Sequence, residues 1–198
     1  MTEAEIKLFG KRLNSTNRAG ANEVFRWLLQ TDFFTAPASA GGHDGCEGGL
    51  VHHSNAVATL ALELRKAIVH LRPGMEKLLP EQSVMLVSLL HDVCKVNTYT
   101  PHEGWAINEQ GRIQRNYSYK KDISKLPFGH GEKSVILLLQ QGLQLDDEEI
   151  LAIRWHMGAW ELAPFSGDAI AQFNKSCKEH PLTLLLQCAD MMAANYFG

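Results

Sequence analysis

The chain lacks the closely paired cysteines of a zinc finger. It has four cysteines, Cys46, Cys94, Cys177 and Cys188, and no two of them form a CxxC pair. A zinc finger needs such pairs, so this spacing excludes one. We therefore expect reduced thiols in a cytoplasmic protein.

Long apolar runs and a strong charge of either sign are also missing. No stretch approaches the ~18 consecutive apolar residues of a membrane span, and the N-terminal MTEAEIKLFGKRL is acidic and then amphipathic, unlike a secretory signal. The formal net charge is only -3, which argues against broad, nonspecific nucleic-acid binding. We expect neither a membrane nor an extended nucleic-acid surface among the partners, and the composition leaves the oligomeric state open.

No internal repeat, low-complexity tract or linker divides the 198 residues. The apolar content of 45% is that of an ordinary globular protein, and the length suits one domain with a substantial core. We expect a single domain over residues 1–198, with N-terminal helices within residues 1–33. Apolar residues at helical spacing predict helices over 2–14, 21–30, 50–71, 81–95, 131–141, 146–157, 167–178 and 181–196.

Two segments break the helical pattern. Residues 34–49 are rich in Gly, Ala and Pro, which is typical of a loop. Within residues 96–128, a glycine-containing turn at Asn108–Gly111 separates two stretches of strand-like composition, which predicts a β-hairpin. The sequence thus predicts an all-α, mostly helical bundle that carries a small β-hairpin insert at about residues 96–128.

Six residues with metal-binding side chains lie in or beside apolar, helix-patterned stretches, where imidazoles and carboxylates are costly to bury without a partner. They are His53, His91, Asp92, His130, His156 and Asp190. His53 shares a helix face with Val57 and Leu60, so it should point inward. Its neighbour His52 lies about 100° round the helix. For each residue alone an ordinary explanation remains, such as a core histidine bonded to a main-chain carbonyl.

Asp92 is the hardest of the six to explain by packing. It lies near the C-terminus of the most apolar predicted helix, where the helix macrodipole disfavours negative charge. An unpaired buried carboxylate would be neutralised or would cost several kcal/mol. Helix capping therefore does not explain Asp92, whereas a nearby cation does.

Together, the four imidazoles and two carboxylates predict a metal centre. Nitrogen donors mixed with carboxylates suit Fe, Mn, Co, Ni or Zn better than Mg or Ca. Six ligands exceed the four of a structural zinc site, so two ions bridged by Asp92 fit the count best. The other histidines show no partner pattern and are expected at the surface: His43, His70, His102 and His180.

Five short segments occur in the order found in one protein family. They are GGLVHHS (Gly48–Ser54), HDVCK (His91–Lys95), GHGEKS (Gly129–Ser134), RWHMG (Arg154–Gly158) and LLLQCAD (Leu184–Asp190). With these flanks the chain resembles the HD superfamily of metal-dependent phosphohydrolases, over roughly residues 48–192. The His-Asp dipeptide alone is a weak signal because chance supplies it often, whereas the ordered set is specific.

The resemblance implies an HD-type helical core whose metal ligands are His53, His91, Asp92 and Asp190. In the two-metal branches of the family, histidines placed like His130 and His156 complete a second site. Lys95 matches a lysine that commonly contacts the substrate phosphate, so Asp92 and Lys95 are the expected catalytic residues. Cys94 stands where many relatives have glycine.

The function that the resemblance implies is hydrolysis of a phosphomonoester or phosphodiester of a nucleotide-like small molecule by metal-activated hydroxide. The expected cofactor is a divalent transition metal, with two ions fitting the ligand count best. Two alternatives stay open. One is an HD-fold di-iron oxygenase, which has a similar ligand set, and the other is a nucleotide-sensing module without turnover.

The expected hairpin insert has two interpretations. Its basic residues lie near Tyr117 and Tyr119, an arrangement that would suit a lid over an anionic substrate. They are Arg112, Arg115, Lys120, Lys121 and Lys125. Acidic neighbours, Glu103, Glu109 and Asp122, partly cancel this charge, which favours an ordinary solvated hairpin instead.

Overall fold

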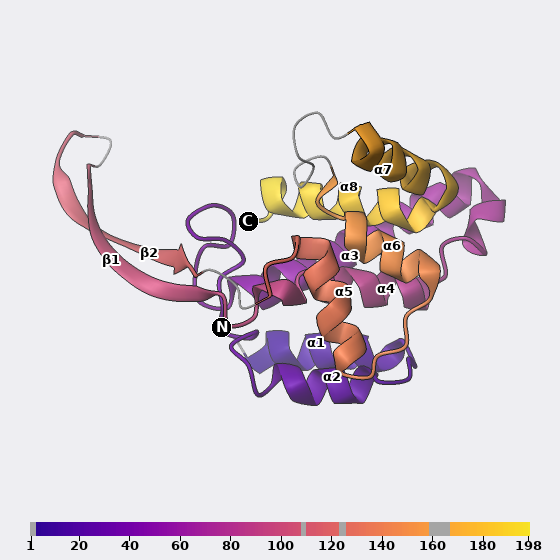
Figure 1. Cartoon of the computed structure of the whole chain (residues 1–198), viewed down its shortest axis with the longest axis horizontal. Coiled ribbons are helices and arrows are strands. Elements are labelled where there is room, and N and C mark those ends of the chain that lie inside the picture. The colour runs from indigo at the N-terminus through magenta and orange to yellow at the C-terminus, as the bar shows by residue number, and fades with distance from the viewer. Residues whose placement is uncertain (1–2, 108–109, 123–125, 159–166) are drawn as a thin grey trace.

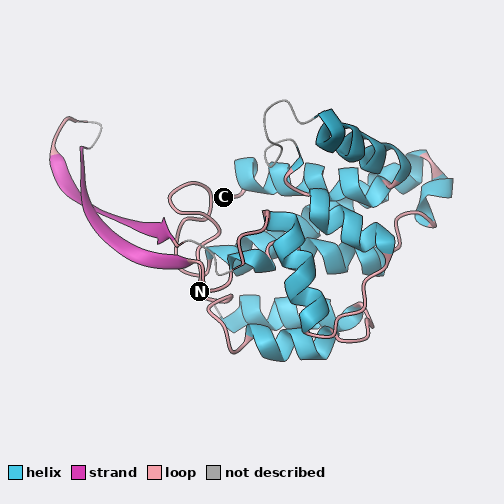
Figure 2. Ribbon diagram, viewed as in Figure 1, coloured by secondary structure: helices cyan, strands magenta, loops and turns pink. Residues whose placement is uncertain are grey.

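The computed structural model describes residues 3–107, 110–122, 126–158 and 167–198. Within them, the chain forms a mostly helical body from which a two-stranded antiparallel hairpin projects (Figure 1, Figure 2). The α-helices are α1 (Glu3–Ser15), α2 (Ala21–Leu28), α3 (Gly49–Leu71), α4 (Glu81–Leu90), α5 (His130–Gln140), α6 (Asp147–Trp155), α7 (Gly167–Glu179) and α8 (Pro181–Tyr196). The predicted combination of a mostly helical fold and a small hairpin is confirmed.

Helix α4 lies in the centre of the body. Its residues from Ser83 to Leu90 are all buried, as the all-round apolar pattern of this segment predicts. Helix α3 packs against α4 and also against α8, while α6 packs against α5 and α8. The elements that carry the predicted metal ligands are therefore neighbours. In the part of the chain that the structure describes, no helix is both long and apolar enough to cross a bilayer.

Helices α1 and α2 cover one side of this core, in the lower part of Figure 1. Their attachment is largely aromatic: the ring of Phe9 lies 5.2 Å from that of Phe33 and 5.6 Å from that of Phe34, centroid to centroid. Phe9 and Phe33 are completely buried, and fully burying such a side chain stabilises a fold by roughly 1.5–3 kcal/mol. The N-terminal helices are thus part of the same core.

The α-helix that the sequence predicts over residues 81–95 is shorter in the structure. It ends at Leu90, and a separate 3-10 turn spans Val93–Lys95. Asp92 has φ -106° and ψ 17°, away from helical values, and the N–H of Lys95 donates to the carbonyl of Asp92 rather than to that of His91. This tighter turn brings the side chains of Asp92 and Lys95 together at the end of α4.

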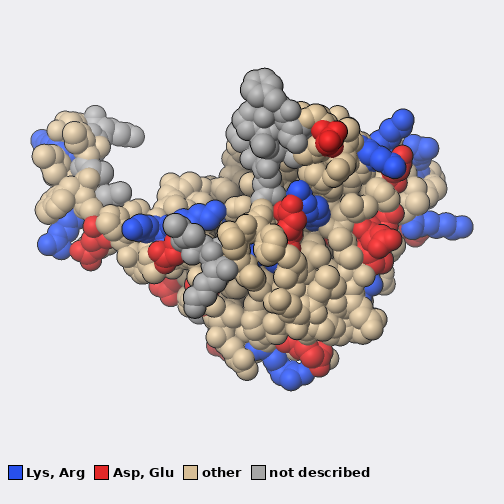
Figure 3. Space-filling model, in the orientation of Figure 1, with Lys and Arg blue, Asp and Glu red and all other residues tan. Residues whose placement is uncertain are grey.

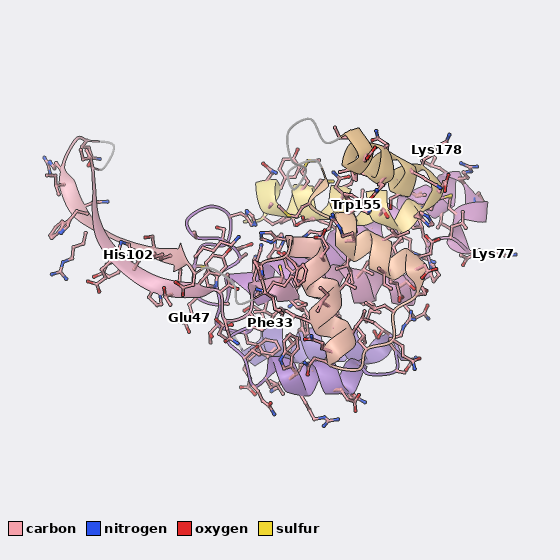
Figure 4. The ribbon with its side chains drawn as sticks, viewed as in Figure 1. Phe33, Glu47, Lys77, His102, Trp155 and Lys178 are labelled. Atoms are coloured by element: carbon pink, nitrogen blue, oxygen red, sulfur yellow. The ribbon has the colours of Figure 1, made fainter. Side chains whose placement is uncertain are left out.

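The hairpin consists of β1 (Tyr99–Ile107) and β2 (Ile113–Lys121), paired from Tyr99 with Lys121 to Ile107 with Ile113. It extends away from the helices, as the position of His102 shows (Figure 4). At its base, Tyr119 donates a backbone hydrogen bond to Ala40. Three residues of the expected insert, Asn108, Glu109 and Lys125, lie outside the described residues. On the face drawn in Figure 3, acidic and basic side chains are interspersed along the hairpin as well as over the body.

Residues 34–48 form turns without a helix or strand, as the composition of the predicted loop 34–49 indicates, and Gly49 begins α3. Its backbone folds back on itself: Ala38 donates to the carbonyl of Asp44, and Leu50 donates to that of Ala36. A Cβ atom on Gly49 would collide with the main chain of Asp44. Glycine is therefore required where this loop enters α3.

Candidate metal centre

Five of the six predicted ligands meet inside the helical body. His53 comes from the second turn of α3, His91 and Asp92 from the end of α4, His156 from the C-terminal end of α6, and Asp190 from α8. The three histidines are at most 1% exposed and Asp92 is 2% exposed. A buried group of imidazoles and carboxylates at this density needs compensating charge.

One set of donor atoms gathers around Asp92 Oδ2 and Asp190 Oδ1. His91 Nε2 lies 3.5 Å from the first oxygen and 3.6 Å from the second. His53 Nε2 lies 3.9 Å and 2.9 Å from the same two atoms. Ligands about 2.0–2.2 Å from a common ion are separated by about 3.0–3.6 Å, so three of these spacings suit one ion, whereas the distance from His53 Nε2 to Asp92 Oδ2 is longer.

A second set lies near the other oxygen of the Asp92 carboxylate, and one of its members, His156, also lies within 4.8 Å of the ligand atoms of His91 and Asp190. Asp92 Oδ1 is 3.5 Å from His156 Nε2 and 4.0 Å from Cys94 Sγ. His130, the first residue of α5, is half-buried, and its Nδ1 lies 3.5 Å from the same sulfur. Ligand atoms of Asp92, Cys94 and His130 all lie within 4.8 Å of one another. His130 is thus next to the centre through Asp92 and Cys94, apart from the first set.

The tautomers of two histidines are fixed by the main chain. His91 Nδ1 lies 2.9 Å from the carbonyl oxygen of Ser88, and His156 Nδ1 lies 2.7 Å from that of Ile153. A carbonyl oxygen only accepts, so Nδ1 carries the proton in each ring. The two Nε2 atoms are buried and, among the described residues, have no hydrogen-bond partner. Each Nε2 therefore faces carboxylate oxygens, a position that suits either a second ring proton or a bound cation.

The pKa values of the ionisable groups at the centre reflect the charges of their neighbours. Burial lowers the pKa of His91, but the carboxylates of Asp92 and Asp190 outweigh it and raise that pKa to about 10. Burial raises the pKa of Asp92, but Lys95 and His91 outweigh it and hold that pKa well below its usual range. The pKa of Lys95 is raised because Asp92 outweighs the effect of burial. The negative charge of the carboxylates, which raises the pKa of His91 and of Lys95, would also attract a metal cation of suitable size.

Cys94 is a protonated thiol when no metal is bound. Burial and the Asp92 carboxylate raise the pKa of the Cys94 thiol to about 12. The backbone N–H of Cys94 donates to the Ser134 hydroxyl at 3.1 Å, which ties the 3-10 turn to α5. This contact fixes the sulfur against His130.

Close helix packing positions His130 relative to His156. A Cβ atom on Gly131 would collide with the main chain of Arg154, including its carbonyl. Glycine therefore lets the start of α5 approach the end of α6 within backbone contact. These are the two helix ends that carry His130 and His156.

The sequence interpretation missed the contribution of the loop before α3. His43, expected at the surface, is half-buried, and its ring centroid lies 5.1 Å from that of His53. Asp44 Oδ2 lies 4.0 Å from His53 Nδ1. A second His-Asp dipeptide in a glycine-rich loop was the available signal. By contrast, His52 is exposed and its Nδ1 contacts Glu5.

Two cavities meet at Lys95. One, of about 470 Å³, is lined by His43, Asp92, Lys95, Asp190 and other residues of α8. The other, of about 340 Å³, is lined by three lysines (Lys95, Lys121 and Lys133), by His130 and by Phe128. Both volumes are in the range of small-molecule sites. The buried ammonium of Lys95 thus faces two spaces beside the donor cluster.

Comparison with known proteins gave no relative on which to base an assignment. A scan against models of protein families, a search of curated proteins and a search of solved structures each found no match. The likeness to the HD superfamily therefore depends on this chain's own residues. The molecule is a mostly helical protein with buried histidine and aspartate clusters that can hold a metal ion.

Proposed function

We propose that this chain is an HD-type, metal-dependent phosphohydrolase acting on a small nucleotide-like phosphoester. The observation that carries the proposal is the orientation of His91 and His156. Each ring donates from Nδ1 to a main-chain carbonyl and turns toward Asp92 a buried Nε2 that has no hydrogen-bond partner among the described residues. Nitrogens from two different helix ends thus face one buried carboxylate, which is the arrangement a bound cation needs.

The division of donors around Asp92 supports two ions. Oδ2 faces His53 and His91, and Oδ1 faces His156. A carboxylate whose two oxygens each face imidazole nitrogens is suited to bridge two cations, one on each oxygen. The mixture of nitrogen and oxygen donors suits Fe, Mn, Co, Ni or Zn.

A pair of such ions, when bound, would supply hydroxide near neutral pH and stabilise charge on the phosphoryl oxygens. Lys95 would bind and orient the phosphoryl group, since its ammonium is buried and lines both cavities. His53 and Asp190 would hold the ion on the α3 and α8 side. Burial of these groups excludes bulk water, which strengthens every charge interaction in the site.

The larger cavity supports a substrate with an uncharged polar part beyond its phosphate. Gln187 and Asn195 place amide groups on its wall, and Met157 and Met191 add apolar surface. Amide side chains offer both donors and acceptors, and thioether side chains adapt to flat or irregular groups. This lining suits a nucleoside better than a second strongly anionic group.

Elemental analysis of the purified protein tests the proposal. We expect up to two transition-metal ions per chain in the wild type and a large loss in the double variant His91→Ala, Asp92→Ala. His52→Ala is the matched control, because it removes an exposed imidazole next to His53. Equal metal content in the wild type and the double variant would remove the basis of the proposal.

Activity then separates the three functions. With Mn²⁺ or Co²⁺ bound, a phosphohydrolase cleaves at least one ester in a panel of nucleotides and phosphomonoesters. Bound iron with a mixed-valence electron paramagnetic resonance signal, and no cleavage, would instead indicate an oxygenase. Full metal occupancy with neither activity would indicate a sensing module.

A further inference from the structure

We infer that Cys94 is a metal ligand, and that it completes a sulfur-containing second site with Asp92, His130 and His156. This inference rests on the proposed function, because it adds a donor to the second site of the same centre. It gives the two ions different surroundings: the first has nitrogen and oxygen donors only, whereas the second has two nitrogens, one oxygen and one sulfur. The second site would therefore select zinc, cobalt or iron over manganese and magnesium.

The distances from the Cys94 sulfur to its neighbouring donor atoms can be compared with those of a tetrahedral site. Metal–sulfur and metal–nitrogen bonds of about 2.3 and 2.05 Å place the two ligand atoms about 3.6 Å apart in a tetrahedron. Cys94 Sγ lies 3.5 Å from His130 Nδ1. The same sulfur lies 4.0 Å from Asp92 Oδ1, about 0.5 Å beyond the tetrahedral spacing, so these two side chains would move closer together around an ion.

His156 supplies an independent sign that an ion belongs here. Its ring is 1% exposed, its Nε2 has no hydrogen-bond partner among the described residues, and that atom points to Asp92 Oδ1 at 3.5 Å. This is the oxygen that faces Cys94. Two different donors, from α6 and from the 3-10 turn, thus converge on one carboxylate oxygen.

The surroundings of Cys94 favour coordination over an ordinary packing role. The side chain is buried, with 4% exposure, and its backbone is held by Ser134. It also borders the smaller cavity together with His130, so an ion has access from that side. On coordination the thiol proton passes to solvent and the sulfur donates an electron pair to the ion.

Ion binding at His130 would also displace Lys121, at the end of β2. The Lys121 ammonium now donates to His130 Nε2 at 3.2 Å. If Nδ1 binds the ion, the remaining ring proton occupies Nε2; if Nε2 binds it, that lone pair is used. In either case the ammonium loses its acceptor. The second ion and the Lys121 hydrogen bond therefore exclude each other, which couples the ion to the base of the hairpin.

Cobalt titration of the full chain tests the role of Cys94, since a cobalt–thiolate bond gives an intense near-ultraviolet charge-transfer band. We expect this band to grow with one of two cobalt equivalents in the wild type. Cys94→Ser should lose the band, retain the first equivalent, and bind the second at least roughly 10-fold more weakly. Cys46→Ser, which removes an exposed thiol, is the matched control and should retain the band.

A second measurement needs no variant. X-ray absorption of the wild-type protein loaded with two zinc ions should show one sulfur for every two zinc ions, at about 2.3 Å. Cobalt binding without a charge-transfer band, or a band that persists in Cys94→Ser, would overturn the role of Cys94 and leave the phosphohydrolase proposal intact. A wild-type protein that binds no metal at all would overturn both.

Discussion

Lys95 Nζ lies 2.6 Å from Asp92 Oδ2, and both side chains are buried. The 3-10 turn after α4 creates this contact, because it sets the two residues one tight turn apart. The same oxygen faces His53 and His91. Lys95 therefore provides part of the positive charge that Asp92 requires, in the place where the proposed ions would provide the rest.

Replacing Lys95 should destabilise the metal-free protein more than the metal-loaded one. Lys95→Met leaves Asp92 buried with less compensating charge, which costs on the order of 3 kcal/mol. Zinc or cobalt should restore most of this loss, because the ions neutralise the same carboxylate. Urea unfolding with and without chelator measures both values, and Lys77→Met, at an exposed position, is the control. The same destabilisation with and without metal would contradict this account of Lys95.

Metal removal should lower the melting temperature. An ion at 100 times its dissociation constant stabilises the fold by about 2.7 kcal/mol, or roughly 5–10 °C for a domain of this size. Asp190→Asn should abolish most of this shift, since it weakens the donor set shared with His53 and His91. Asp168→Asn, on an exposed part of α7, should leave it unchanged. Calorimetry with and without chelator measures the shift, and a full shift in Asp190→Asn would refute the role given to that carboxylate.

The ion pair between Arg18 and Glu149 predicts a pH effect away from the metal centre. Burial raises the pKa of Glu149, and this outweighs the hydrogen bond from Ser83 and the charge of Arg18. The fold thus favours the protonated acid, so the contribution of Glu149 to stability falls as pH rises above ~4.3. Arg18→Met should steepen this fall, because it leaves the carboxylate unpaired.

We expect Arg18→Met to cost on the order of 3 kcal/mol at pH 7 and clearly less near pH 4.5. Adding Glu149→Gln to that variant should recover much of the loss at pH 7, since a neutral amide needs no cation. Denaturant unfolding at the two pH values measures the difference. A cost for Arg18→Met that does not change with pH would show that lost packing, rather than the charge of Glu149, is responsible.

Gly131→Ala should separate α5 from α6. The added methyl group meets the main chain of Arg154, which cannot rotate away, and overpacking of this kind costs roughly 1–3 kcal/mol. Binding of the second metal equivalent should weaken as well, because His130 moves relative to His156. Gly74→Ala adds a methyl group where no atom lies within 4 Å and should be neutral in both measurements, thermal unfolding and metal titration. An unchanged second equivalent in Gly131→Ala would contradict the packing argument.

Helical periodicity was informative where burial is continuous along a segment. The apolar face shared by His53, Val57 and Leu60 requires one helix orientation, and the structure has it. The local pattern did not reveal where α4 ends, because the apolar residues Val93 and Cys94 continue past Leu90. The break is visible in the dihedral angles of Asp92 and in the backbone hydrogen bond of Lys95 to Asp92.

The path of the loop before α3 was even harder to predict from the sequence than the end of α4. Its path is set by backbone hydrogen bonds within a segment that has no regular apolar pattern, such as those from Gly48 to Thr35 and from Leu50 to Ala36. No pattern of apolar residues indicates that His43 reaches the ring of His53. Composition identified the segment as a loop, whereas its contribution to the centre depends on tertiary contacts.

His53 and Asp190 are 137 positions apart in the chain, yet their side chains touch. An ion bound by both side chains would act as a reversible cross-link that closes the chain between these two residues into a loop. This cross-link would oppose local unfolding of α3 and of α8, because the two helices could not separate while the ion is bound. Resistance to proteases would then increase with the concentration of available metal, and the lifetime of the folded protein would depend on how fully its site is occupied.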